Sequence, residues 1–128
     1  MFGSGEKNRL ASFIGAGSFF KGDISVKGTF RIDGEFEGTI TADTLIVGEK
    51  AYIKGDVTVK NANIGGRVEG NITAENLVEI GQKGYVNGNI TTGKISIAEG
   101  GIYNGKITMD NKPSKIVDFQ TEQVNKFN

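Results

Sequence analysis

A glycine that recurs at a nearly fixed interval constrains this chain more than any other feature of its sequence. The glycine lies in the pattern apolar, any residue, glycine, any residue, apolar, as in Val-Asn-Gly-Asn-Ile at 86–90. The six copies lie 15 to 18 residues apart, at Gly22, Gly38, Gly55, Gly70, Gly88 and Gly105. A fixed period with one small structural unit per repeat is typical of a solenoid, in which successive coils stack on one another.

The residue types between these glycines favour strands. Valine, isoleucine, phenylalanine and threonine are abundant from residue 14 to residue 109, and no amphipathic stretch there is long enough for a good helix. We therefore predict one all-β domain over residues 14–110. A flexible N-terminal tail is expected over 1–13, and a C-terminal tail over 111–128, beyond Met109, is expected to be partly docked or disordered.

Short alternating pairs of apolar residues indicate which side chains point inward, because successive side chains of a strand lie on opposite faces. Three such pairs occur in a coil, which predicts a triangular cross-section, about six coils, and parallel pairing of each strand with its equivalents above and below. The glycines are expected where the chain turns with a positive φ or where two backbones approach closely. The three predicted inward rows are Ile24, Ile40, Val57, Ile72 and Ile107; Leu45, Ala62 and Ile95; and Phe36, Ile53, Val68, Val86 and Tyr103.

Charge and composition argue against several classes of function. Fifteen basic and fifteen acidic residues give a net charge of zero, so no basic footprint for nucleic acid is expected. The chain has no histidine and no cysteine, which removes the commonest general base and the thiol nucleophile. The glycine pairs at 65–66 and 100–101 are interpreted as turns, because no lysine-serine pair or helix start follows them. We expect no enzyme activity, cofactor, metal or nucleotide.

The two ends of the predicted solenoid are candidate sites of self-association. A solenoid ends in unpaired backbone groups over an open apolar core, and exposed strand edges invite pairing with another chain. No amphipathic helix precedes the first coil as a cap, and the single proline, Pro113, lies beyond the last one. The alternative is a monomer whose tails cap both ends. The predicted polymerisation interface comprises Phe13, Ile14, Phe19, Phe20 and Ile24 in the first coil and Ile102, Tyr103, Ile107 and Met109 in the last.

The N-terminal tail carries an aromatic side chain close to two cations. Met1, Phe2, Lys7 and Arg9 are candidate membrane contacts, since aromatic side chains favour the bilayer interface and cations favour anionic lipid. The alternative is an ordinary disordered terminus. The sequence has no signal peptide and no apolar run long enough to span a bilayer, so we expect a cytoplasmic protein held peripherally at the inner face of the membrane.

The repeated pattern resembles that of the bactofilins over roughly residues 13–112, in the copies at 36–40 (Phe-Glu-Gly-Thr-Ile), 68–72 (Val-Glu-Gly-Asn-Ile) and 86–90. The resemblance implies a bacterial cytoskeletal protein built as a right-handed parallel β-helix. It also implies nucleotide-free polymers with like-with-like joints, hence non-polar filaments, which associate with the cytoplasmic membrane. There such filaments scaffold cell-shape or envelope machinery, including peptidoglycan-synthesis proteins. Many members carry proline-rich tails, whereas this C-terminal tail has one proline.

Two further readings stay open from the residues alone. A left-handed β-helix of the hexapeptide acyltransferase kind would repeat apolar residues every six positions, as Ile24, Phe30 and Phe36 do. That phase slips at Ile40, and such enzymes as a family rely on a histidine base that this chain lacks. The second reading is a monomeric, capped β-solenoid that acts as a binding module.

Overall fold

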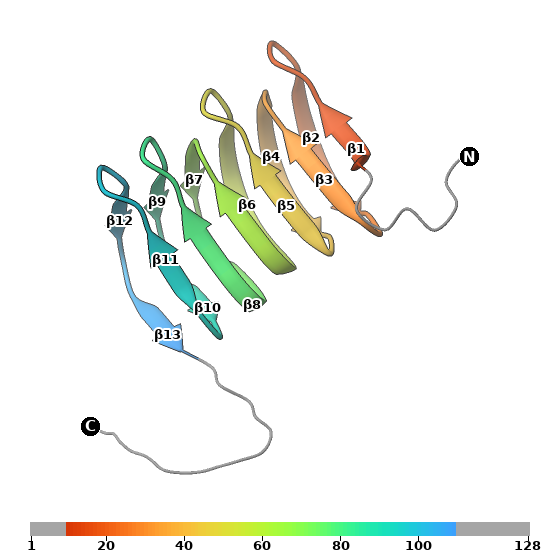
Figure 1. Ribbon diagram of the computed structural model, residues 1–128. Coiled ribbons are helices and arrows are strands. Elements are labelled where there is room, and N and C mark those ends of the chain that lie inside the picture. Colours follow the sequence, from red (N-terminus) through yellow and green to blue (C-terminus); the bar gives the residue numbers. More distant parts are fainter. Residues whose placement is uncertain (1–9, 110–128) are drawn as a thin grey trace.

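The computed structural model describes residues 10–109, and these residues form thirteen β-strands and no helix (Figure 1). The strands are β1 (Leu10–Ile14), β2 (Phe19–Ser25), β3 (Thr29–Ile32), β4 (Glu35–Thr41), β5 (Thr44–Val47), β6 (Tyr52–Ile64), β7 (Arg67–Glu69), β8 (Ile72–Ile80), β9 (Tyr85–Asn87), β10 (Ile90–Thr92), β11 (Ile95–Ile97), β12 (Ile102–Asn104) and β13 (Ile107–Met109).

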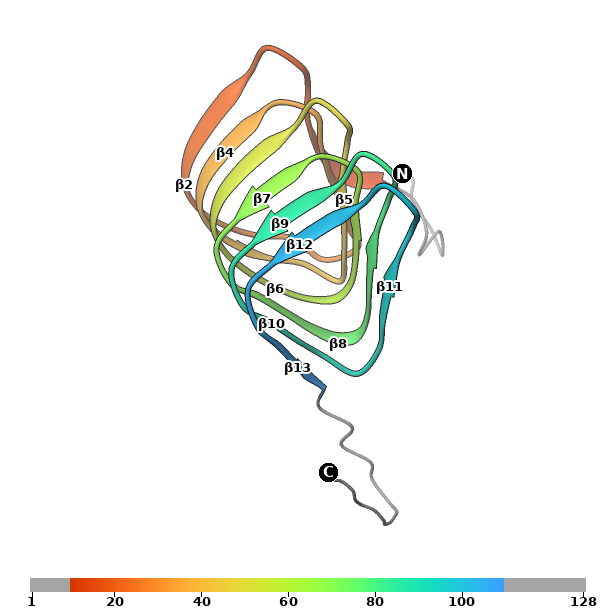
Figure 2. The ribbon, with the colours of Figure 1, turned by 90° about the vertical axis from the view of Figure 1, so that its left-hand side faces the viewer.

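The chain winds into a stack of coils with three sides, which Figure 2 shows nearly end-on. Every strand pairing is parallel, as predicted, and each side is a ladder with one strand segment from every coil. Face A comprises β1, β3, β5, residues 61–64 of β6, residues 77–80 of β8, and β11. Face B comprises residues 19–21, 35–37 and 52–54, followed by β7, β9 and β12. Face C comprises residues 23–25, 39–41, 56–59 and 72–74, followed by β10 and β13.

Each ladder therefore has six members, and the coils can be counted along the chain. The first coil is β1 with β2, the last is β11 with β12 and β13, and the four between them are the central coils. β1 begins at Leu10, four residues before the predicted start of the solenoid, and β13 ends at Met109, close to the predicted end. The predicted docking or disorder of the C-terminal tail lies outside the described residues.

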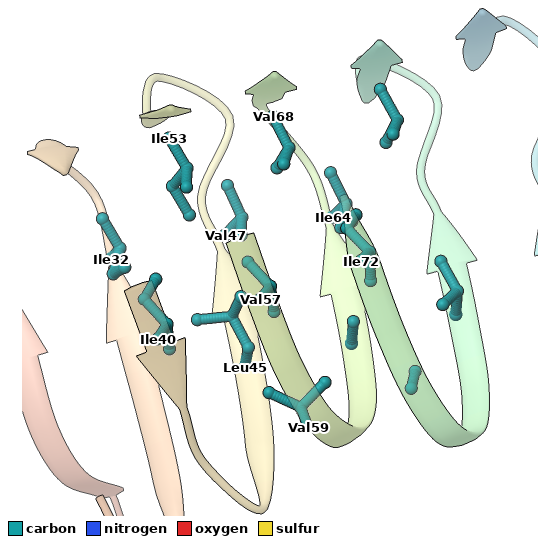
Figure 3. Packing of buried hydrophobic residues seen from close by; sticks show 14 of the residues in the cluster. Ile32, Ile40, Leu45, Val47, Ile53, Val57, Val59, Ile64, Val68 and Ile72 are labelled. Carbon is teal, nitrogen blue, oxygen red and sulfur yellow. The ribbon is translucent and has the colours of Figure 1, made fainter. Parts of the chain in front are cut away.

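The predicted rows coincide with the observed register. Ile40 pairs with Val57 and Ile24 on face C, Leu45 pairs with Ala62 on face A, and the face B row follows the same order. Apolar side chains of the central coils fill the space between the three faces, so the core is one narrow column (Figure 3). Phe30, Ile32, Ile40, Leu45, Ile53, Ile64, Val68, Val78, Val86 and Ile90 are each 0% exposed.

The recurrent glycines satisfy both predicted requirements at once. All six have a positive φ, 145° at Gly55 for example, which L side chains rarely adopt. They also stack directly on one another at the corner between faces B and C. A Cβ on Gly55 would collide with the carbonyl oxygen of Gly38, and a Cβ on Gly70 with that of Gly55. Glycine at this corner lets successive coils approach to the spacing that backbone hydrogen bonding needs.

A polar and aromatic cluster joins three central coils on the outer side of face B. The Arg67 guanidinium carbon lies 5.7 Å from the ring centre of Tyr52 and 4.6 Å from that of Tyr85. Arg67 Nη2 and the Tyr52 hydroxyl both donate to the carboxylate of Glu69, at 2.8 and 2.9 Å. These two bonds, with the Arg67 contribution the larger, lower the pKa of Glu69 below its ordinary value of 4.5. The cluster ties neighbouring coils together through their side chains.

Candidate assembly interface

The terminal coils leave strand edges without a partner inside the described chain. β1 pairs only with β3 and β2 only with β4, so the N-terminal sides of both strands are open. At the other end, β11, β12 and β13 pair only with β8, β9 and β10. Unpaired N–H and C=O groups of this kind form a template for another chain. Within residues 10–109, both ends of the stack therefore offer strand edges with which a further coil can pair.

The inward side chains of the first coil lack the cover that their equivalents in the second coil have. Ile14, Phe20 and Ile24 are in register with Ile32, Phe36 and Ile40, which are at most 1% exposed. The first-coil residues are only half-buried, as is Val26 beside them. Phe20 stacks on Phe36 with ring centres 5.3 Å apart and planes inclined by 11°, so only one face of the Phe20 ring is covered by this stack.

The last coil presents a second set of inward side chains. Ile95, Tyr103 and Ile107 are half-buried, and Ile97 and Met109 are exposed although each pairs with an inward residue of the coil before it. Ile95 and Ile97 were not among the predicted interface residues. Their sequence signal was their place in the same inward row as Leu45 and its equivalents, at the point where the row ends.

The two ends differ in chemistry. At the N-terminal end the inward row is aliphatic and aromatic apart from the half-buried Ser12, which pairs with Phe30. The C-terminal end contains the hydroxyl of Tyr103, which donates to the carbonyl oxygen of Gly88 at 2.8 Å. Burial raises the pKa of Tyr103 above its ordinary value. The hydroxyl therefore stays protonated at neutral pH and its hydrogen bond is kept. A joint at this end has to accommodate one satisfied polar group among apolar side chains.

Three of the predicted interface residues lie on the outside of the stack. Phe13 pairs with Arg31, Phe19 with Glu35 and Ile102 with Tyr85, and each therefore alternates with an inward neighbour. The exposed fractions are 55%, 60% and 55% for Phe13, Phe19 and Ile102. The structure thus divides the predicted set into inward residues at the open ends and outward residues at their rims.

In the part of the chain whose side chains are described, exposed large apolar side chains are confined to the two terminal coils. They are Phe13, Phe19, Ile97, Ile102 and Met109. The central coils have a closed core, and the aliphatic residues of their outer rows, Ile46 and Leu77, are half-buried. Since scattered exposed apolar residues are normal on soluble proteins, it is their restriction to the two ends that marks these surfaces.

The predicted membrane contacts Met1, Phe2, Lys7 and Arg9 lie outside the described residues. The part of the chain that is described, residues 10–109, contains no helix able to cross a bilayer. The same residues contain no group of three or more acidic side chains placed to hold a metal ion.

The fold places this chain among the parallel β-solenoid proteins. The family profile described as "Bactofilin: Polymer-forming cytoskeletal" matches residues 12–108. Bactofilin BacO of Myxococcus xanthus (strain DK1622) is 34% identical over 100 residues, which cover 77% of this chain and 79% of that relative. No solved structure gave a significant match. The chain belongs to the bactofilin family, a polymer-forming cytoskeletal family, which favours a structural role over the acyltransferase alternative.

Proposed function

We propose that this chain assembles end to end, through its first and last coils, into filaments that need no nucleotide. The observation that carries the proposal is that the described chain's exposed large apolar side chains and open strand edges occur together at the two ends of the stack. The filaments would scaffold cell-shape or envelope machinery at the cytoplasmic membrane. Like-with-like joints, and hence a non-polar filament, follow from the family resemblance.

Joining two ends continues the packing that the central coils already have. Ile24 and Ile107 are half-buried, whereas Ile40 and Ile90, the equivalents beside them, are 0% exposed. Each square ångström of apolar surface removed from water contributes about 25 cal/mol. The joint also pairs backbone groups that are open in the single chain. Both gains are obtained only at the ends, which favours linear growth.

Nucleotide independence is supported by the roles of the paired glycines. A Cβ on Gly66 would collide with the carbonyl oxygen of Gly48, and a Cβ on Gly101 would lie 2.7 Å from that of Gly81. Close packing between successive turns therefore accounts for both glycine pairs without a phosphate cradle. We expect assembly to depend on protein concentration and to be unchanged by ATP or GTP with magnesium.

The test introduces an aspartate at an inward position of the last coil and compares it with an aspartate at an outward position of the same coil. Ile107→Asp places a carboxylate in the joint, where burial without a partner costs several kcal/mol. Asn104→Asp adds the same charge to an exposed outward position in the same coil. Electron microscopy in nucleotide-free buffer should show long filaments for the wild type and for Asn104→Asp, and short or absent filaments for Ile107→Asp with β-sheet circular dichroism retained. Normal filaments from Ile107→Asp would contradict the proposal at that end.

A further inference from the structure

Face C carries a row of hydroxyl side chains that runs the whole length of the stack. The row has one member in each coil, and consecutive members are paired in register. Five of the six side chains are exposed and one is half-buried. The row consists of Ser25, Thr41, Thr58, Thr73, Thr91 and Thr108.

A second row of exposed side chains lies two residues earlier in every coil, along the edge at which the face C segments begin. Each of its members precedes an inward residue of the ladder, and all six are exposed. The row is acidic near the N-terminal end and basic at the C-terminal end. Its members, in coil order, are Asp23, Thr39, Asp56, Asn71, Asn89 and Lys106.

Faces A and B have a different outer surface. One outer row of face B has lysine and glutamate in alternation from Lys21 to Glu69. The other outer row includes the stack of Tyr52, Arg67 and Tyr85. Face A carries the ion pair of Arg31 with Asp33, whose Nε and Oδ2 atoms are 2.8 Å apart. The two outer rows of face C contain no aromatic residue and no arginine. Face C is therefore the side on which another flat surface can approach the strands most closely.

Threonine rows suit contact with a copy of themselves. A hydroxyl is both a donor and an acceptor, so two identical rows can hydrogen-bond to each other. The β-branched side chain is already restricted at χ1 in a strand, so packing removes little rotamer entropy. The abundance of threonine alone follows from its strand propensity. The second row supplies an independent argument, because its acidic residues near one end and its lysine at the other complement those of an antiparallel copy.

We propose that face C is a lateral interface, on which a subunit of a second filament packs antiparallel to the first subunit. A two-fold axis lying in the face, at right angles to the stack, brings each row opposite its own copy in reverse order. Asp23 then faces Lys106 of the second copy at both ends of the contact. In the hydroxyl row, Thr58 faces Thr73 of the second copy and Thr41 faces its Thr91.

The contact is too small to hold two single subunits together. Six strands at about 4.8 Å, with about three residues each across the face, give an area of about 300 Å² per copy. Stable interfaces bury about 800 Å² per partner. In a filament the same contact repeats along a rigid rod, so later contacts form at a high effective concentration. The inference therefore rests on the proposed end-to-end assembly, and pairing follows polymerisation.

The first test places a charge at the centre of face C. Thr58→Glu lies in a central coil away from both ends, and Asn63→Glu adds the same charge to an exposed position of face A on the same strand, β6. Electron microscopy should show paired filaments for the wild type and for Asn63→Glu. The Thr58→Glu variant should form single filaments of normal length. Low-speed sedimentation collects only paired or bundled filaments. It should pellet the wild-type and Asn63→Glu polymers and leave the Thr58→Glu polymer in the supernatant.

A charge pair tests the antiparallel register. Thr41 and Thr91 lie in the second and fifth coils, so charges placed there are too distant to pair within one subunit. Thr41→Lys alone or Thr91→Glu alone should weaken filament pairing, and the double variant should restore it because the new charges face each other between rods. Wild-type filaments that remain single, undiminished pairing in Thr58→Glu, or no rescue by the double variant would overturn the inference. Absence of any wild-type polymer would instead overturn the proposed function, and this inference with it.

Discussion

The central coils and the terminal coils have the same inward pattern and differ in what covers it. On face C, Ile40, Val57 and Ile72 are at most 1% exposed, while Ile24 and Ile107 continue the same row at its two ends and are half-buried. The residues are of one kind and their strands are in one register. The difference teaches that a coil is completed by its neighbours, because no coil can bury its own inward face.

That comparison separates stability from assembly. A change in a central coil removes contacts on both sides and should weaken the fold of the single subunit. A change in a terminal coil removes contacts on one side within the subunit, and its open side would face the proposed joint. Substitutions of one type at equivalent positions of the row should therefore have different outcomes, which makes the comparison testable.

The largest effect is expected from Ile72→Asp. Its side chain is 1% exposed, so the carboxylate would lose water without gaining a partner, at a cost of several kcal/mol, in addition to the cavity it leaves. Circular dichroism should show an unfolded chain. Ile107→Asp, in the same row, should retain the β spectrum. A folded Ile72→Asp would show that a coil can open locally without loss of the stack.

The next effect compares one glycine substitution in two coils. Gly55 and Gly22 have φ values of 145° and 143°, so alanine imposes similar backbone strain at both, about 1–3 kcal/mol. The added Cβ would also collide with the Gly38 carbonyl oxygen at position 55, whereas at position 22 it meets only the Phe20 ring at 3.5 Å. Gly55→Ala should therefore be less stable than Gly22→Ala by about a further 1–3 kcal/mol.

Urea unfolding would measure this difference. A background carrying both Ile14→Asp and Ile107→Asp keeps polymer from contributing to the midpoint and leaves the Phe20 ring beside Gly22 in place. Equal midpoints for the two glycine variants would mean that contact between stacked glycines does not set the coil spacing, and that positive φ alone explains these residues.

A smaller effect concerns the N-terminal tail and depends on the ends of the rod. We propose that Phe2, with Lys7 and Arg9, tethers the filament to membrane. One buried phenylalanine contributes about 2–3 kcal/mol and each nearby cation about 1 kcal/mol, so a lone subunit binds marginally while a filament binds through many tails. In vesicle co-sedimentation with anionic lipid, Phe2→Ala should reduce pelleting, and Ile107→Asp should reduce it as well. If Ile107→Asp pellets with vesicles as well as the wild type does, polymerisation does not contribute to membrane binding.

The smallest effect is a pH-dependent one in the central coils. Arg67 and then Tyr52 hold the pKa of Glu69 below its ordinary 4.5, so this contribution to stability is present above that pH and is lost as the pH falls through the lowered value. Tyr52→Phe removes the hydrogen bond to Glu69 and should lower the melting temperature slightly at pH 7. The difference from wild type should disappear in acid.

Tyr85→Phe is the matched control for that experiment. It removes a hydroxyl from the other ring beside Arg67, and that hydroxyl makes no hydrogen bond with residues 10–109. Its melting temperature should follow that of wild type at every pH. A difference for Tyr52→Phe that persists unchanged in acid would indicate lost packing rather than the bond to Glu69.

Much of the fold follows from two periods in the sequence. Alternation within strands sets which side chains point inward, and the glycine interval sets which residues stack, so the rows containing Ile40, Leu45 and Phe36 were predicted correctly. The same glycine spacing also aligns the residues of the cluster on face B, which was not predicted. Tyr52, Arg67 and Tyr85 each lie three residues before a recurrent glycine, so the same count would have aligned them.

The inward and outward residues of the terminal coils were harder to predict, because alternation has to be assigned correctly at the point where the repeat stops. Phe13 lies one residue before the end of β1, and Phe19 begins β2 after the turn at 15–18. Both lie outward, although they were grouped with the inward residues Ile14 and Phe20. The start of β1 was also missed, since Leu10 has no earlier coil with which to align. Apolar character alone does not distinguish an open end from its rim.

The mass of variants blocked at one end tests the central claim most directly. If the joints are at the ends and like meets like, Phe20→Asp leaves only C-terminal joints and Ile107→Asp leaves only N-terminal ones. Light scattering after size exclusion should then give about twice the subunit mass of 13.6 kDa for each single variant, and the subunit mass for the double variant. If both single variants have the mass of one subunit, the joints are still at the ends but are head-to-tail instead of like-with-like. Long filaments from either single variant would contradict end-to-end assembly through that coil.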